Sequence, residues 1–267
     1  MTKPVVNVFF DFNSPYSLLT ILRLYLRLQN TSYKAEYSTS SADYSHPALS
    51  KVSFVLKPIE YGLVLKKSGI KGTPIAAGSK RRDYMWLDVS RALKRMGQPQ
   101  IDDSKLSNWP QKASTPNRIV YLLQDKTLLF KSAAEVLTAE EASSLKSAYS
   151  TCDSDLISVT FAYKIFYGLF VENSVVSDDG YLVQQLSDTL KTHVSNPEQL
   201  ASVIVGIASK SQILKKESFI GTEEAMTKGF FGVPTFTFDN CPLFYWGNDH
   251  MTDAAIEALE SKLDSKL

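Results

Sequence analysis

The sequence predicts an α/β fold in which a large helical block separates two strand-containing ends. Residues 5–10 are apolar and rich in β-branched and aromatic side chains, which is typical of a buried strand. A helix and a second strand-like run at 33–39 follow, so the chain opens as strand–helix–strand, with a parallel pair if both strands share a sheet. At the other end, 235–238 and 243–246 resemble the two strands of a hairpin before a last helix. Alternation at both ends, with helices between, indicates an α/β domain carrying an inserted helical subdomain.

The first helix has a clear start. Ser14 suits the N-cap, and Pro15 suits the first helical position, where its missing N–H has no partner to lose. Further along, apolar periodicity predicts helices at 83–96, 156–171 and 198–209, and a last helix at 251–263. The segment 40–82 is richer in Ser, Gly, Pro and Lys. We therefore expect it to be loop-like, with uncertain helical pieces.

Composition excludes several classes of protein. The 267 residues are 44% hydrophobic and 21% charged, which is ordinary globular composition. Lys and Arg number 29 against 28 Asp and Glu, so there is no basic excess of the kind that nucleic-acid binding uses. No stretch approaches the ~20 apolar residues of a membrane-spanning helix. We expect neither a nucleic-acid partner nor a membrane span.

The cysteines and histidines argue against two kinds of site. Cys152 and Cys241 lie far apart and form no C-x-x-C pair, which excludes a disulfide scaffold and a dithiol redox protein. The three histidines, His46, His193 and His250, have no metal-ligand spacing. We therefore expect no metal.

Three turns contain residues that could carry chemistry. Ser14 lies at a helix N-terminus, where backbone N–H groups favour an anion and where its hydroxyl can donate to one, although the turn alone favours a plain N-cap. Val233 precedes Pro234 at the start of a strand. A cis bond there would expose the Val233 backbone to a ligand, and an edge turn is the alternative. Asp249, before the last helix, would bind an amine or cap that helix, and its spacing alone favours the cap.

Together these turns form the skeleton of a thioredoxin fold, and they resemble a known family. The segments FDFNSPYS (10–17), TEEAM (222–226), GFFGVPTF (229–236) and FYWGNDHM (244–251) are similar to the kappa-class glutathione transferases and the 2-hydroxychromene-2-carboxylate isomerases, which share a DsbA-like thioredoxin fold. The resemblance covers nearly the whole chain in order. Its terminal blocks are specific, and its middle is loose.

The resemblance implies a domain organisation and a ligand. It implies a thioredoxin-like domain of residues 1–45 and 215–267, with residues 46–214 as the inserted helical domain, usually in a homodimer. It implies glutathione as co-substrate, together with a small hydrophobic electrophile or a peroxide. Ser14 would be the catalytic residue that keeps the glutathione thiolate ionised. The residues implied to bind glutathione are Pro15, Tyr16, Val233, Pro234, Asn248 and Asp249, with Val233 pairing to the cysteinyl part and Asp249 facing the γ-glutamyl ammonium.

The sequence also departs from the family. Ile70 stands where relatives often carry an Asn that contacts glutathione, in a loop about two residues longer than theirs. Lys71, Lys80 or Arg81 would offer a positive charge to the glycyl carboxylate, and a solvated loop is the alternative. His250 replaces an Arg that many relatives have, which we interpret as a surface variation.

Several functions therefore remain open. The first is a glutathione transferase. The second is an isomerase in which glutathione adds reversibly to an unsaturated acid derived from an aromatic ring. The third is a binding or chaperone-like protein on the same scaffold without turnover. A dithiol oxidoreductase is nearly excluded, because Ser14 and Ser17 occupy the two C-x-x-C positions.

The two ends of the chain give an expectation about location. The N-terminus shows no secretory signal. The chain ends in Ser265, Lys266 and Leu267, the S-K-L address that the peroxisomal import receptor reads. The sequence therefore predicts a peroxisomal protein, in agreement with the kappa class, whose members are found in peroxisomes as well as mitochondria.

Overall fold

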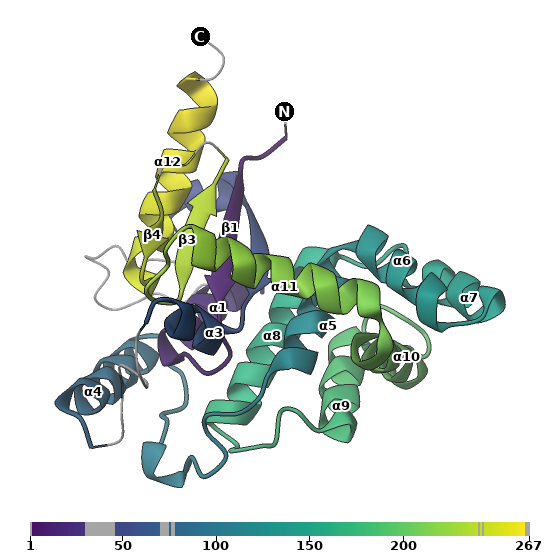
Figure 1. The fold of residues 1–267 in the computed structure, drawn as a ribbon, viewed down its shortest axis with the longest axis horizontal. Coiled ribbons are helices and arrows are strands. Elements are labelled where there is room, and N and C mark those ends of the chain that lie inside the picture. The colour runs from purple at the N-terminus through teal and green to yellow at the C-terminus, as the bar shows by residue number, and fades with distance from the viewer. Residues whose placement is uncertain are drawn as a thin grey trace.

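A four-stranded sheet lies at one end of the molecule in the computed structural model, which describes residues 2–29, 46–69, 75, 78–239, 241 and 243–264 (Figure 1). The strand order is β2 (Ser53–Pro58), β1 (Val5–Phe10), β3 (Thr235–Phe238) and β4 (Tyr245–Trp246). β1 runs parallel to β2 and antiparallel to β3, and β3 is antiparallel to β4. The predicted C-terminal hairpin is confirmed. Strands from the two ends of the chain meet at β1.

The strand parallel to β1 is not where the sequence predicted one. The predicted strand at 33–39 lies outside the described residues. β2 falls inside 40–82, so the expectation of a loop there was wrong for 53–58. In the sequence this segment shows only a short apolar run, Phe54 to Leu56. The alternation appears in the fold, where Phe54 and Leu56 are buried and Val55 and Lys57 are partly exposed. Short helices α2 (Pro47–Lys51) and α3 (Tyr61–Lys67) flank this strand. β2 therefore belongs to the sheet although it lies within residues 46–214, the range expected to form the inserted helical domain.

Helices make up most of the segment between β2 and β3. The predicted helices at 83–96, 156–171 and 198–209 are confirmed as α4 (Lys80–Arg95), α8 (Ser154–Phe170) and α10 (Pro197–Lys210). The remaining elements of this block are the 3₁₀ turn η1 (Asp103–Lys105), α5 (Ser114–Gln124), α6 (Lys126–Val136), α7 (Ala139–Tyr149), α9 (Asp179–Leu190) and α11 (Gln212–Thr227). Figure 1 shows α6, α7, α9 and α10 at the end opposite the sheet, with α11 leading back toward it.

One hydrophobic core joins the sheet to the helices. α1 (Pro15–Leu28) packs against α8 and α4. Phe10 and Phe12 reach from the end of β1 to Phe166 of α8, with ring centroids 5.9 and 4.9 Å from that of Phe166. The last helix, α12 (Met251–Asp264), buries its apolar face against the sheet and confirms the helix predicted at 251–263. The predicted α/β fold with a helical insertion is therefore the observed one.

Within the described part of the chain, no helix is long and apolar enough to cross a membrane. In the same residues, no group of three or more His, Cys, Asp and Glu side chains is placed to hold a metal ion.

Candidate functional site

Ser14 lies where β1 has ended and α1 begins, as predicted. Its backbone N–H donates to the Asp11 carbonyl at 3.0 Å, which closes the turn. Its hydroxyl oxygen accepts from the Ser17 N–H at 3.2 Å, and Pro15 takes the first helical position. Ser14 is therefore a true N-cap. Its side chain lies where the partial positive charge of the 14-residue helix α1 is concentrated.

Two residues of the segment between η1 and α5, Trp109 and Gln111, bond to the turn before Ser14. The sequence did not indicate these contacts. The Asn13 carboxamide oxygen accepts from the Gln111 backbone N–H at 2.7 Å, and its Nδ2 donates to the Gln111 carbonyl at 2.9 Å. The Trp109 indole N–H donates to the Asn13 carbonyl at 3.0 Å. These bonds span nearly a hundred residues of sequence and fix the backbone directly before Ser14.

The Asp11 side chain also stabilises this turn. Its side chain is 8% exposed, and it accepts from the backbone N–H groups of Asn13 at 2.7 Å and Tyr61 at 2.9 Å. Burial raises the pKa of the Asp11 carboxyl above its ordinary value, and the negative charge of Glu60 raises it further, against the lowering effect of the two backbone bonds. Asp11 thus joins the end of β1 to the start of α3.

The Val233–Pro234 peptide bond is cis, which confirms that prediction. The Ser14 hydroxyl donates to the Val233 carbonyl at 3.2 Å, so the start of α1 and this bond lie side by side. The β1–β3 ladder starts at Thr235, after Pro234, so the Val233 backbone lies outside the sheet. The predicted juxtaposition of a hydroxyl, a helix N-terminus and a backbone outside the ladder is therefore present.

An aromatic surface borders the same bond. Phe231 is 52% exposed and Trp246 is 48% exposed, with ring centroids 4.9 Å apart. A Cβ on Gly232 would lie 2.0 Å from the Trp246 indole nitrogen, so only glycine fits beneath that ring. The Tyr61 hydroxyl donates to the Phe231 carbonyl at 2.6 Å, and burial raises the pKa of Tyr61 to about 12. The residues directly before Pro234 are thus held by Trp246, which packs on Gly232, and by Tyr61, which bonds to Phe231.

Tyr16 lies in the first turn of α1 and contacts α4. Its hydroxyl donates to the Asp88 carboxylate at 3.1 Å. Burial raises the pKa of Tyr16 well above its usual range, and the negative charge of Asp88 raises it further. Tyr16 therefore stays protonated and acts as a hydrogen-bond donor.

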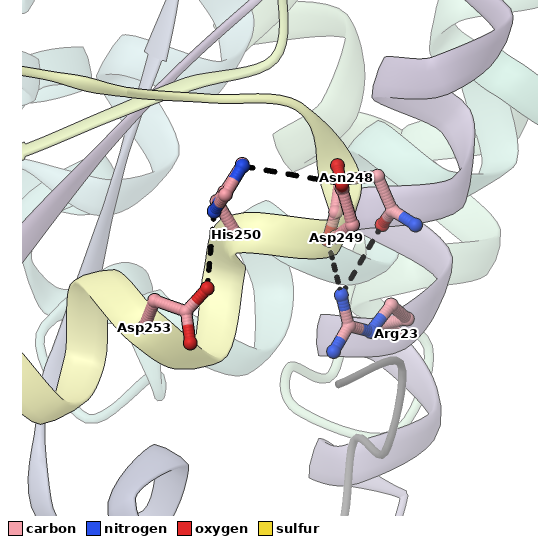
Figure 2. Close-up of polar contacts among 5 residues, drawn as sticks. All are labelled: Arg23, Asn248, Asp249, His250 and Asp253. Carbon is pink, nitrogen blue, oxygen red and sulfur yellow. Dashed lines mark hydrogen bonds and ion pairs between the residues drawn. The ribbon is translucent and has the colours of Figure 1, made fainter. Parts of the chain in front are cut away.

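Asn248 and Asp249 lie in a 3₁₀ turn, η2 (Asn248–His250), which packs against α1 (Figure 2). Arg23 of α1 donates to both the backbone carbonyl and the side-chain oxygen of Asn248. The Asp249 side chain is 72% exposed, and no backbone N–H among the described residues donates to it. The capping role that its spacing favoured is therefore wrong. Its exposed carboxylate lies 4.0 Å from the Nε2 atom of His250.

α1 therefore connects the three predicted segments. Ser14 at its N-terminus contacts the cis-proline loop, and Arg23 contacts η2. Lys80 and Arg81 are exposed at the start of α4, the helix that reaches Tyr16 through Asp88. Ile70 and Lys71 lie outside the described residues, as do Ser265, Lys266 and Leu267. The site also depends on Asn13, Thr20 and Arg23, whose roles no local sequence pattern indicated.

Solved structures share this fold along nearly the whole chain. A 2-hydroxychromene-2-carboxylate isomerase matches with a TM-score of 0.58 and 16% identity, covering 98% of this chain and 97% of its own. A probable DsbA oxidoreductase from Streptomyces coelicolor matches at 0.53 and 16%, covering 96% and 90%. A putative protein disulfide isomerase from Nitrosomonas europaea matches at 0.53 and 14%, covering 98% of each chain. No family model matches the sequence, and comparison with curated proteins gives no match.

The shared fold is the thioredoxin-like, DsbA-like one that the sequence predicted. Dithiol exchange needs a thiolate at the start of the first helix, and this chain has serines at both positions. Ser17 is fully buried in the first turn of α1. The two cysteines are free, with Cys152 buried between α7 and α8 and Cys241 in the hairpin. The residues at this site therefore favour an oxygen donor over a redox-active thiol.

Proposed function

We propose that this protein is a glutathione transferase of the kappa-class type, in which Ser14 holds the glutathione thiolate for attack on an electrophile or a peroxide. One observation carries the proposal. The Ser14 hydroxyl, at the N-terminus of α1, lies 3.2 Å from the carbonyl oxygen of Val233, directly before a cis proline. A hydroxyl donor and a helix dipole both favour the anionic form of a sulfur placed beside them.

The cysteinyl and γ-glutamyl parts of glutathione each have matching groups among the described residues. The Ser14 O–H would turn from the Val233 carbonyl to the thiolate, and the cysteinyl N–H of the tripeptide would replace it at that carbonyl. Pro15, Tyr16 and Pro234 would border the cysteinyl part. At the far end, Asn248 and the exposed carboxylate of Asp249 would meet the γ-glutamyl group, with Asp249 facing its ammonium.

The chain's own residues act on the sulfur mainly by stabilising its charge. With a carbon electrophile, a sulfur–carbon bond forms and the leaving group departs with its electron pair. With a peroxide, a sulfur–oxygen bond forms as the O–O bond breaks, and a second glutathione then displaces that oxygen to give the disulfide, with protons supplied by water. The exposed rings of Phe231 and Trp246 provide an apolar surface beside the site for a hydrophobic second substrate.

The isomerase is the second candidate, because the isomerase structure matches this chain over 97% of its own length at a TM-score of 0.58. The same thiolate would add to a conjugated double bond, allow rotation about the resulting single bond, and leave again. The two reactions share the Ser14 chemistry and differ only in the second substrate. A non-catalytic binding protein is the third possibility, and the experiment below distinguishes it.

The test combines binding with turnover. Calorimetry with reduced glutathione is expected to show micromolar to millimolar binding that weakens in Asp249→Ala. The matched control is Glu257→Ala, an exposed carboxylate further along α12. Turnover of an activated aryl chloride is expected to saturate and to be lost in Ser14→Ala. Binding without turnover would identify a binding protein, and isomerisation without net glutathione consumption would identify the isomerase. Absence of glutathione binding would overturn the proposal.

We also propose a peroxisomal location and a homodimer. The location follows from Ser265, Lys266 and Leu267, read by the import receptor. A fluorescent fusion that ends in the native C-terminus is expected to enter peroxisomes, and deletion of Leu267 is expected to leave it in the cytosol.

Light scattering on the purified protein tests the dimer, and a monomeric mass at micromolar concentration would contradict it.

A further inference from the structure

We infer that Thr20 and Arg23 orient the Asn248 amide so that its nitrogen donates to the α-carboxylate of the γ-glutamyl group, which makes them positioning residues for glutathione. The inference rests on the proposed function and states how the far end of that ligand is recognised. Neither residue touches the Ser14 hydroxyl. Both act through η2.

Thr20 and Arg23 lie three residues apart and therefore share one face of α1. Thr20 is fully buried and Arg23 is 1% exposed. A guanidinium is costly to bury unless its donors are satisfied. The donors of Arg23 reach the Asn248 backbone carbonyl, the Asn248 side-chain oxygen at 3.4 Å and the Thr252 hydroxyl at 3.5 Å. Arg23 thus joins α1 to η2 and to the first turn of α12.

These contacts decide which way the Asn248 amide faces. Its oxygen accepts from the Thr20 hydroxyl at 3.2 Å as well as from Arg23. A guanidinium can only donate, so the atom facing it must be the oxygen of the amide. The amide nitrogen is therefore the atom of this side chain to which Thr20 and Arg23 do not bond. It donates to none of the described residues, and the side chain is half-buried, so this NH₂ group remains for a ligand.

The resulting pair of groups matches an amino acid. Asn248 presents N–H donors and takes the carboxylate, whereas the adjacent Asp249 presents an exposed carboxylate and takes the ammonium. Figure 2 shows Arg23 on the side of η2 that faces α1, bonded to Asn248, with His250 and Asp253 paired on the other side of the turn at 3.0 Å. Because Arg23 is buried, it recognises the ligand through Asn248 and not by direct contact.

The decisive variant is Asn248→Asp. Aspartate keeps acceptor oxygens for Thr20 and Arg23, so the turn is expected to fold with an unchanged or higher melting temperature. The nitrogen donors are lost, and a negative charge faces the ligand carboxylate. We expect reduced glutathione to bind about tenfold more weakly or worse, the size of a lost hydrogen bond to a charged group.

A ligand analogue separates recognition from structure. γ-Aminobutyryl-cysteinyl-glycine lacks only the α-carboxylate of glutathione. The wild type is expected to bind it about tenfold more weakly than glutathione, and Asn248→Asp is expected to lose that preference. A merely structural role of Asn248 would weaken both peptides equally and keep the preference, which would overturn the inference.

The positioning residues are tested on the same two peptides. Thr20→Val removes one hydroxyl at nearly constant shape, and Arg23→Lys keeps the charge without the planar fork. Both are expected to reduce the preference for glutathione, whereas Arg27→Lys, one turn further along α1 and next to Phe54, is expected to keep it. An undiminished preference in Thr20→Val would contradict the positioning role. If the wild type bound neither peptide, the proposed function itself would fail, which is a different result.

Discussion

The Ser14 hydroxyl donates a hydrogen bond to the carbonyl oxygen of Val233 at 3.2 Å, across 219 residues of sequence. The same hydroxyl oxygen accepts from Ser17 at the first turn of α1. One side chain thus caps a helix and reaches the backbone beside a cis proline, which lies outside the sheet ladder. This relationship is the structural basis of the proposed thiolate site.

Ser14→Ala is expected to lower turnover of an aryl chloride by about a hundredfold or more, the usual effect of removing a donor to a developing or stored anion. The KM for glutathione is expected to change much less. The thiolate's ultraviolet absorbance in the bound complex should titrate at higher pH in the variant, because one stabilising bond is gone. An unchanged titration would contradict the role of Ser14.

The control for that variant is Thr138→Ala. Thr138 caps α7, which Figure 1 shows at the end of the molecule opposite the sheet, and its hydroxyl oxygen accepts from the Glu141 N–H at 3.3 Å. Loss of either cap is expected to lower the free energy of unfolding by about 1 kcal/mol. Only Ser14→Ala should affect turnover, which separates capping from chemistry.

Tyr16→Phe is expected to lower the free energy of unfolding by about 1 kcal/mol, because the hydrogen bond to Asp88 is lost. The alkaline limb of the pH–rate profile should be the same in variant and wild type, since the pKa of Tyr16 is raised far above the range in which it would act as a base. Asp88→Asn keeps an acceptor oxygen and should cost less stability. Loss of an alkaline titration in Tyr16→Phe would contradict this assignment.

Gly232→Ala is expected to destabilise the protein by about 1–3 kcal/mol and to lower turnover, because the new methyl group would overlap the Trp246 indole. Adding Trp246→Ala should restore part of the stability, and a double-mutant cycle measures that coupling. Gly206→Ala is the matched control. Nothing lies within 4 Å of a Cβ there, and the α10 helix should gain about 0.5–1 kcal/mol. Additive effects in the cycle would show that the two residues do not clash.

Asp11 is expected to make the free energy of unfolding depend on pH. Burial raises the pKa of its carboxyl in the folded protein above the ordinary value of 3.8, so the folded state holds its proton more tightly than the unfolded chain does. The stability that Asp11 contributes is therefore full below about pH 4 and is lost as the pH rises through the folded-state pKa. Urea unfolding of wild type and Asp11→Asn across this range measures it. A wild type that gains stability relative to Asp11→Asn as the pH rises would contradict the sign.

Local pattern in the sequence was sufficient for several elements. Apolar β-branched residues predicted β1, Ser14 and Pro15 predicted the start of α1, and alternation around the turn at 239–240 predicted the hairpin. These features depend on neighbours a few residues apart, for which propensity, capping and periodicity are strong signals. The absence of cysteine at 14 and 17 also decided, from sequence alone, against dithiol exchange at this site.

Tertiary structure alone decided how those pieces meet. β2 was hidden in a segment of polar composition, and only its parallel pairing with β1 makes it a strand of the sheet. The bonds from Gln111 to Asn13 and from Arg23 to Asn248 join segments about 100 and 225 residues apart. No local pattern encodes such contacts, because they depend on the chain topology. The sequence by itself determined which groups this protein has for binding an anion, and the fold decided which of them face one another.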